Sequence, residues 1–125
     1  MRAGAQALGL SLWADRGALL ADTATAIVMP AGVDEAEVRS VARVESGVML
    51  AGGQGALRGR VLQIGHMGPA AYPMSPVIGL AALGHALRRL GATADVGAAV
   101  EAALAARDDD GYNGGHGGPA AGTTC

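Results

Sequence analysis

The sequence contains no lysine, because all nine of its basic residues are arginine. A chain without lysine has no side-chain amine, which excludes a mechanism in which its own side chain forms a Schiff base with a carbonyl compound. The single cysteine, Cys125, excludes an internal disulfide framework and a zinc site made of several cysteines. The net charge of −2 is not that of a nucleic-acid-binding domain, and no basic stripe is present.

Aromatic residues are also scarce. Phenylalanine is absent and Trp13 is the only tryptophan, so the core must consist of Leu, Val, Ile and Met around one expected aromatic anchor, Trp13. No apolar run approaches the roughly 18 residues that span a bilayer, and the N-terminus lacks the apolar region of a signal peptide. A length of 125 residues allows one domain with a modest core. We therefore expect a single cytoplasmic domain.

Glycine is abundant and is concentrated between two apolar runs, at residues 48–50 and 60–67. Four glycines fall within eight residues there: Gly52, Gly53, Gly55 and Gly59. Glycine adopts positive φ without steric cost and allows close approach to its backbone, so the segment predicts a hairpin whose loop faces a ligand or a partner. A flexible loop is the alternative. A phosphate-binding loop is excluded because neither of the glycine-rich phosphate motifs is present.

Apolar periodicity and capping residues predict the remaining elements. We expect the end of a helix up to Leu8, strands at 10–13 and 23–29, and helices that begin near Asp34, Ser75 and Thr93. In the helix after Asp34, the charged residues Glu35, Arg39 and Arg43 are expected on a solvated face. Helices on one face of a small antiparallel sheet make an α+β fold. The apolar pattern stops after Arg107, so we predict a domain over 1–107 and a disordered glycine-rich tail over 108–125.

The region from Gly52 to Gly68 carries a family resemblance. Its run Ile64-Gly65-His66-Met67-Gly68, preceded by the glycine-rich loop, resembles the C-terminal small domain of class V (fold-type I) pyridoxal-phosphate-dependent aminotransferases. The resemblance is to the alanine–glyoxylate and serine–pyruvate group, and 69–73 are most similar to its pyridoxamine–pyruvate branch. It covers roughly residues 1 to 107 and implies the small-domain α+β fold.

The resemblance also implies a function. Relatives transfer an amino group to a small α-keto acid of the pyruvate or glyoxylate type, with pyridoxal phosphate or pyridoxamine bound in a large domain that this chain lacks. We expect the chain to position the substrate and to close over it, with a transaminase large domain or a homodimer partner as its protein partner. Because no lysine is present, we expect no bound cofactor and no activity from this chain alone.

Candidate site residues follow from the matched positions. The resemblance implies an arginine at position 63 that binds the substrate carboxylate and a second arginine at position 54, yet the chain has Gln63 and Gln54. A glutamine brings hydrogen bonds but no charge. Arg60 and Arg58 are the nearest cations for the carboxylate, and a solvated surface role is the alternative. We assign no catalytic residue and no metal site to this chain.

Other polar residues have simpler explanations. His66 is expected to be a hydrogen-bonded structural residue of its strand, Tyr72 a packing residue and Ser75 the N-cap of the following helix. Two further functions stay open. A βαββα order is also typical of free-standing ferredoxin-like modules that bind small effectors, and the chain could equally be a folded but inactive remnant.

Overall fold

The computed structural model describes residues 1–13, 24–65 and 72–109. Its elements are α1 (Arg2–Ala7), β1 (Ala24–Val28), α2 (Glu35–Ser46), β2 (Ala51–Gly52), the 3₁₀ turn η1 (Gly55–Leu57), β3 (Val61–Gly65), α3 (Ser75–Arg89) and α4 (Val96–Asp109). The predicted α+β class is confirmed. His66, the end of its strand, and the tail from residue 110 lie outside the described residues.

The sheet has three strands in the order β1–β3–β2, and both pairs are antiparallel. Ile27 of β1 lies opposite Leu62 of β3, and both side chains are fully buried against the helices. The predicted strand at 10–13 is only a single bridge, in which Leu12 lies opposite Ile27. Side chains alternate between the two faces of a sheet along each strand. Ile27 and Leu62 mark the face toward the helices, so the residues next to them in β1 and β3 point to the opposite, outer face.

The predicted strand at 48–50 is wrong, because pairing with β3 begins only at Ala51. The reason lies in how α2 ends. Gly47 adopts a positive φ of 66°, and the N–H of Val48 donates to the carbonyl of Ala42, so the backbone of Val48 completes the helix end. Residues 48–50 therefore connect α2 to the sheet, and β2 is short.

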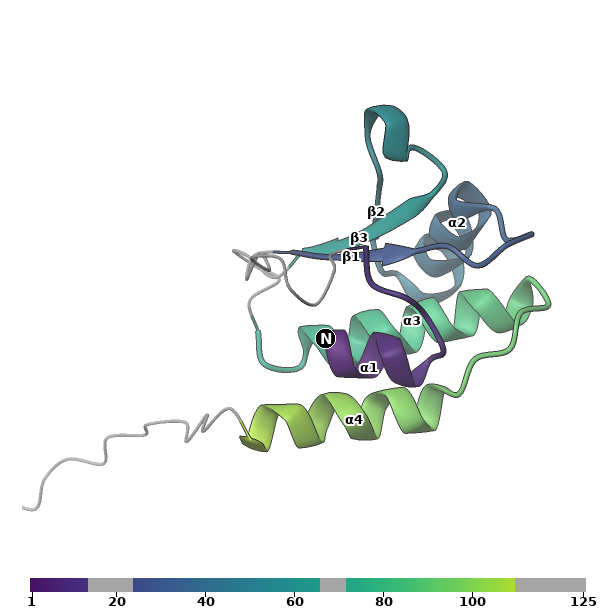
Figure 1. Ribbon diagram of the computed structural model, residues 1–125. Coiled ribbons are helices and arrows are strands. Elements are labelled where there is room, and N and C mark those ends of the chain that lie inside the picture. Colours follow the sequence, from purple (N-terminus) through teal and green to yellow (C-terminus); the bar gives the residue numbers. More distant parts are fainter. Residues whose placement is uncertain (14–23, 66–71, 110–125) are drawn as a thin grey trace, which may run out of the picture.

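In the described part of the chain, the helices lie on one face of the sheet. Figure 1 shows α1, α3 and α4 on one side, and the hairpin that joins β2 to β3 rises on the other side. The core between sheet and helices is aliphatic, with leucines of α3 at its centre, and its largest fully buried side chains are Ile27, Leu62, Leu80, Leu83, Leu87 and Val38. α4 packs on α1 and α3 and forms an outer layer.

Helix starts agree with the predictions in part. Asp34 caps α2, since its Oδ1 accepts from the N–H of Ala36 at 2.7 Å. α3 begins at Ser75 itself with no side-chain cap, so the predicted cap at Ser75 is wrong. α4 is capped by Asp95, whose Oδ1 accepts from the N–H of Ala98 at 3.0 Å. α4 then runs to Asp109, past the predicted domain limit at 107.

Three burial predictions are wrong. Trp13 is 46% exposed and does not anchor the core, because leucines of α3 fill it. Tyr72, expected to pack, is 72% exposed. Glu35, expected on the solvated face of α2, is only 3% exposed and forms an ion pair with Arg39 one turn later. Across the described ranges, no helix is both long enough and apolar enough to cross a membrane.

Candidate functional site

Gln63 occupies the middle of β3 on the outer face of the sheet. It lies opposite Ala26 of β1 on one side and Ala51 of β2 on the other. Its neighbours across the strands thus carry only methyl groups, and Gln63 is half-buried. The side chain of Gln63 therefore stands between two small residues on the outer face of the sheet.

Gln54 lies at the start of the hairpin loop. It is exposed, and its carbonyl accepts from the N–H of Leu57 at 3.0 Å to form the turn η1. Two glycines make this loop possible: a Cβ on Gly53 would collide with the backbone of Leu57, and Gly59 has a φ of 73°. Figure 1 shows the loop rising on the side of the sheet opposite to the helices. Alternation along β3 places the side chain of Gln63 on that same side, because its neighbour Leu62 faces the helices.

Arg60 directly precedes β3 and is exposed. Its Cζ lies 5.9 Å from the centroid of the Trp13 ring, within the range of a cation–π contact. Arg58 is also exposed and ends η1. The sequence indicated Arg60 as a candidate cation but did not indicate its contact with Trp13, which joins residues far apart in the chain.

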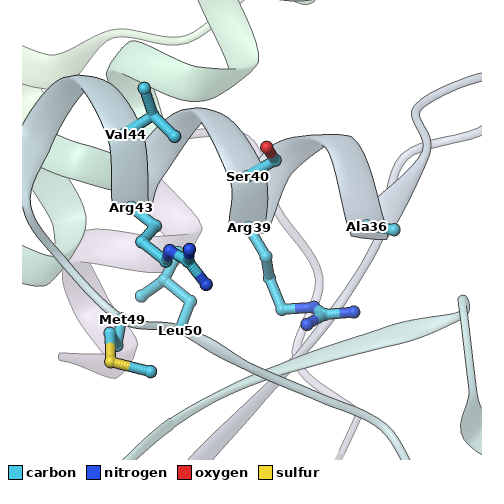
Figure 2. Close-up of a pocket in the computed structure, with 7 residues that line it drawn as sticks. All are labelled: Ala36, Arg39, Ser40, Arg43, Val44, Met49 and Leu50. Atoms are coloured by element: carbon cyan, nitrogen blue, oxygen red, sulfur yellow. The ribbon is translucent and has the colours of Figure 1, made fainter.

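A second polar feature lies on α2, on the helix side of the molecule. A hollow of about 410 Å³ is lined by Ala36, Arg39, Ser40, Arg43, Val44, Met49 and Leu50. Figure 2 shows Arg39 and Arg43 pointing to the same side of α2, and Ser40 and Val44 pointing away from them. Arg39 is bound by Glu35, with a further contact from its Nη2 to Glu35 Oε2 at 3.5 Å. The hollow contains neither Gln63, Gln54 nor Arg60.

A third cluster joins α2 to α3. Glu45 Oε2 lies 2.7 Å from His85 Nε2, and Arg89 Nε donates to Glu45 at 3.1 Å. The hydrogen bond with His85, followed by the hydrogen bond and charge of Arg89, lowers the pKa of Glu45 below its ordinary value of 4.5. The cluster is a surface contact between helices. Among the described residues, no group of three or more His, Cys, Asp or Glu could hold a metal ion.

Comparison with known proteins gives concordant sequence and structure matches. The chain is 44% identical over 110 residues to a pyridoxamine–pyruvate transaminase of Mesorhizobium japonicum, which covers 88% of this chain and 28% of that protein. It is 32% identical over 104 residues to an (S)-ureidoglycine–glyoxylate transaminase of Bacillus subtilis, covering 83% of this chain and 25% of that protein. No protein-family model matches.

Solved structures agree. The crystal structure of a pyridoxamine–pyruvate aminotransferase of Mesorhizobium loti matches with a TM-score of 0.84 at 43% identity, over 87% of this chain and 28% of that one. A ureidoglycine–glyoxylate aminotransferase of Bacillus subtilis matches with a TM-score of 0.78 at 31% identity, over 85% of this chain and 27% of that one. The chain thus spans about a quarter of the length of its relatives. It is homologous to the class V aminotransferases, and its extent fits their C-terminal small domain.

Proposed function

We propose that this chain is the small domain of a transaminase that transfers an amino group to a small α-keto acid of the pyruvate or glyoxylate type. The observation that carries the proposal is the match of 88% of the chain, at 44% identity, to a pyridoxamine–pyruvate transaminase. A TM-score of 0.84 with a related enzyme supports it. In this proposal the chain orients the substrate and closes over it, and a large domain supplies the bond chemistry.

The cofactor implied by the relatives is pyridoxal phosphate or pyridoxamine. The residues of this chain do not fit its covalent site, because the sequence contains no lysine to bind the aldehyde. We therefore assign the cofactor to the large domain. What this chain contributes is restricted to binding, orientation and exclusion of water.

The residues that we propose for substrate binding are Gln63, Gln54 and Arg60. A glutamine amide donates an N–H to a carboxylate oxygen, or accepts from an N–H or O–H with its own oxygen, without adding charge. Gln63 stands on the outer face of the sheet between two alanines, and Gln54 lies at the start of the loop that follows β2. Arg60 is the candidate for the positive charge that a carboxylate needs, because a hydrogen bond to a charged group is stronger than one between neutral groups.

A chimeric enzyme tests the proposal. The C-terminal segment of the Mesorhizobium transaminase that aligns with this chain is replaced by the chain, and amino transfer to pyruvate and to glyoxylate is measured. We expect turnover clearly above that of the Mesorhizobium large domain alone, which is the control. A chimera that folds, binds its cofactor by absorbance, and shows no turnover above this control contradicts the proposal and leaves the inactive-remnant alternative.

The second candidate is a free-standing ferredoxin-like effector-binding module. One observation favours it: β1 and β2 are joined through α2 and are separated in the sheet by β3, which is the split βαβ arrangement of that fold. Such a module acts without a large domain. This alternative predicts that the isolated chain is stable and binds an amino or keto acid, and that the chimera is inactive.

A further inference from the structure

Trp13 lies in line with Gln63 across the outer face of the sheet. The N–H of Trp13 donates to the carbonyl of Ala26 at 3.0 Å, and Ala26 lies opposite Gln63. Leu12 pairs with Ile27 on the core side, so the alternation of the backbone places Trp13 on the outer face. Strands are about 4.8 Å apart, so the backbones of Trp13 and Gln63 are separated by about 10 Å.

Between these two residues in the row lies Ala26, whose side chain is a methyl group. Trp13 is 46% exposed and Gln63 is half-buried. On the outer face, a large flat indole and a long amide therefore lie on either side of a small residue, in one row across the sheet.

Arg60 adds a charge to the indole side. Its guanidinium lies over the Trp13 ring, with Cζ 5.9 Å from the ring centroid. Indole is neutral, so this contact orients the guanidinium without cancelling its charge and leaves the N–H groups in its plane able to bind a carboxylate. Among the described residues, no ion pair joins Arg60 to a carboxylate.

Other oriented arginines are already engaged. Arg39 is paired with buried Glu35, and Arg89 is paired with Glu45. Arg88 donates to the carbonyl of Ala94 at 2.6 Å. Arg60 therefore combines a defined orientation with an uncompensated charge, which is the combination that an anion site requires.

We propose that Trp13 is a positioning residue that holds Arg60 beside this row of the outer face, where Arg60 binds the carboxylate of the keto acid from one side and Gln63 donates a hydrogen bond from the other. This inference rests on the proposed function for the identity of the ligand. It assigns to Trp13 and Arg60 together the charge that neither Gln63 nor Gln54 supplies. Binding of the acid then depends on an aromatic ring that does not itself touch it.

Pyruvate binding to the full ¹⁵N-labelled chain tests the site without any cofactor or turnover. Pyruvate is titrated at constant ionic strength against chloride, and the backbone amide shifts of Ala26, Gln63 and Ala51 are followed. We expect saturable shifts. Arg60→Gln should raise Kd at least about tenfold, as expected for loss of a charged hydrogen-bond donor. Arg43→Gln, which removes an exposed arginine from α2, is the matched control and should leave Kd unchanged.

Two variants of Trp13 separate positioning from structure. Trp13→Ala should raise Kd several-fold, whereas Trp13→Phe should keep it within about twofold, because a phenyl face also attracts a guanidinium. The ¹⁵N spectra show that each variant is folded. Absence of saturable shifts in the wild type overturns the proposal, as does an unchanged Kd in Arg60→Gln or equal Kd values in the two Trp13 variants.

The pyruvate titration tests the carboxylate site, the chimera tests the transaminase role, and each can fail without the other. Saturable, Arg60-dependent shifts beside an inactive chimera sustain the carboxylate site and refute the transaminase role. An active chimera whose KM for pyruvate is unchanged by Arg60→Gln, beside a chain that shows no saturable shifts, refutes the carboxylate site and sustains the transaminase role.

Discussion

A Cβ atom on Gly52 would lie 2.5 Å from Oε1 of Glu35. Gly52 belongs to the edge strand β2, and Glu35 is the first residue of α2. The glycine thus leaves the space in which a buried carboxylate forms its ion pair with Arg39. This relationship connects the edge of the sheet to the start of α2 and explains why β2 carries a glycine at this point.

Gly52→Ala should destabilise the chain by about 1–3 kcal/mol, because the added methyl group must displace the Glu35 carboxylate from its pairing with Arg39. Gly65→Ala is the matched control in β3, since a Cβ there meets no atom of the described residues within 4 Å. Urea unfolding measures both. Equal stabilities of the two variants would show that the Glu35 side chain moves at no cost.

Arg39→Met should cost about 1–3 kcal/mol, because it leaves the carboxylate of Glu35, which is 3% exposed, without its ion-pair partner. Arg43→Met removes an exposed arginine one turn further along α2 and should change stability by no more than about 0.5 kcal/mol. Both are measured by urea unfolding. A similar loss in both variants would mean that the packing of the long side chains, and not the ion pair, carries the stability.

Asp34 and Glu35, at the start of α2, differ in whether their roles could be predicted from the sequence. Asp34 as the cap of α2 was predictable, because a cap is a contact between neighbours in the chain. The burial of Glu35 was not, because it depends on Gly52, which reaches Glu35 only through the pairing of β2 with β3. Charge alternation along α2 therefore indicated a solvated face where the sheet in fact covers one residue.

At the candidate site, too, the sequence predicted the local structure but not the contacts between strands. That Gln63 lies on a strand followed from the apolar run around it, and this is confirmed. Its position in line with Trp13 depends on a bridge between residues 12 and 27 and on the register of β1 with β3. A lone tryptophan in an aliphatic sequence indicated a core anchor. The leucines of α3 fill the core instead, and Trp13 remains 46% exposed beside Arg60.

α1 should depend on Gly4 for its docking on α4. A Cβ on Gly4 would lie 2.8 Å from the carbonyl oxygen of Ala99, so Gly4→Ala should destabilise by about 1–3 kcal/mol through separation of the helices. Gly97→Ala in α4 is the control. Among the described residues, a Cβ there meets Asp95 Oδ1 alone, at 3.5 Å, which is an ordinary contact, so this variant should gain about 0.5–1 kcal/mol of helix stability. Thermal unfolding of both variants checks the opposite signs.

The contact between Glu45 and His85 should make stability depend on pH in the acid range. The pKa of Glu45 is lowered below 4.5 in the folded chain. The Glu45 carboxylate therefore contributes to the free energy of unfolding above pH 4.5, and this contribution is lost as the pH falls through the lowered pKa. Glu45→Gln should therefore lower Tm near pH 7, and the difference from wild type should vanish well below pH 4.5. A difference that persists in acid would mean that the carboxylate charge is not its cause.

Gln63→Arg tests whether position 63 faces the substrate, and the chimera with the Mesorhizobium large domain is the place to measure it. An arginine supplies two parallel N–H donors and a full charge where glutamine supplies a neutral amide. If it binds substrate and transition state equally, KM for pyruvate should fall by about ten- to a hundredfold while kcat stays nearly constant. Gln6→Arg, an exposed position on α1, is the matched control and should leave KM unchanged.

Gln63→Arg should also lower the stability of the chimera when no keto acid is bound. An arginine at the half-buried position 63 is an unpaired charge when no carboxylate is bound, so Tm of the Gln63→Arg chimera should fall without keto acid and recover when pyruvate is added. The two measurements depend on one geometry, in which the side chain at position 63 reaches the ligand. An unchanged KM together with a Tm that pyruvate does not raise would mean that the outer face of the sheet has the fold of a transaminase small domain without its contact to substrate.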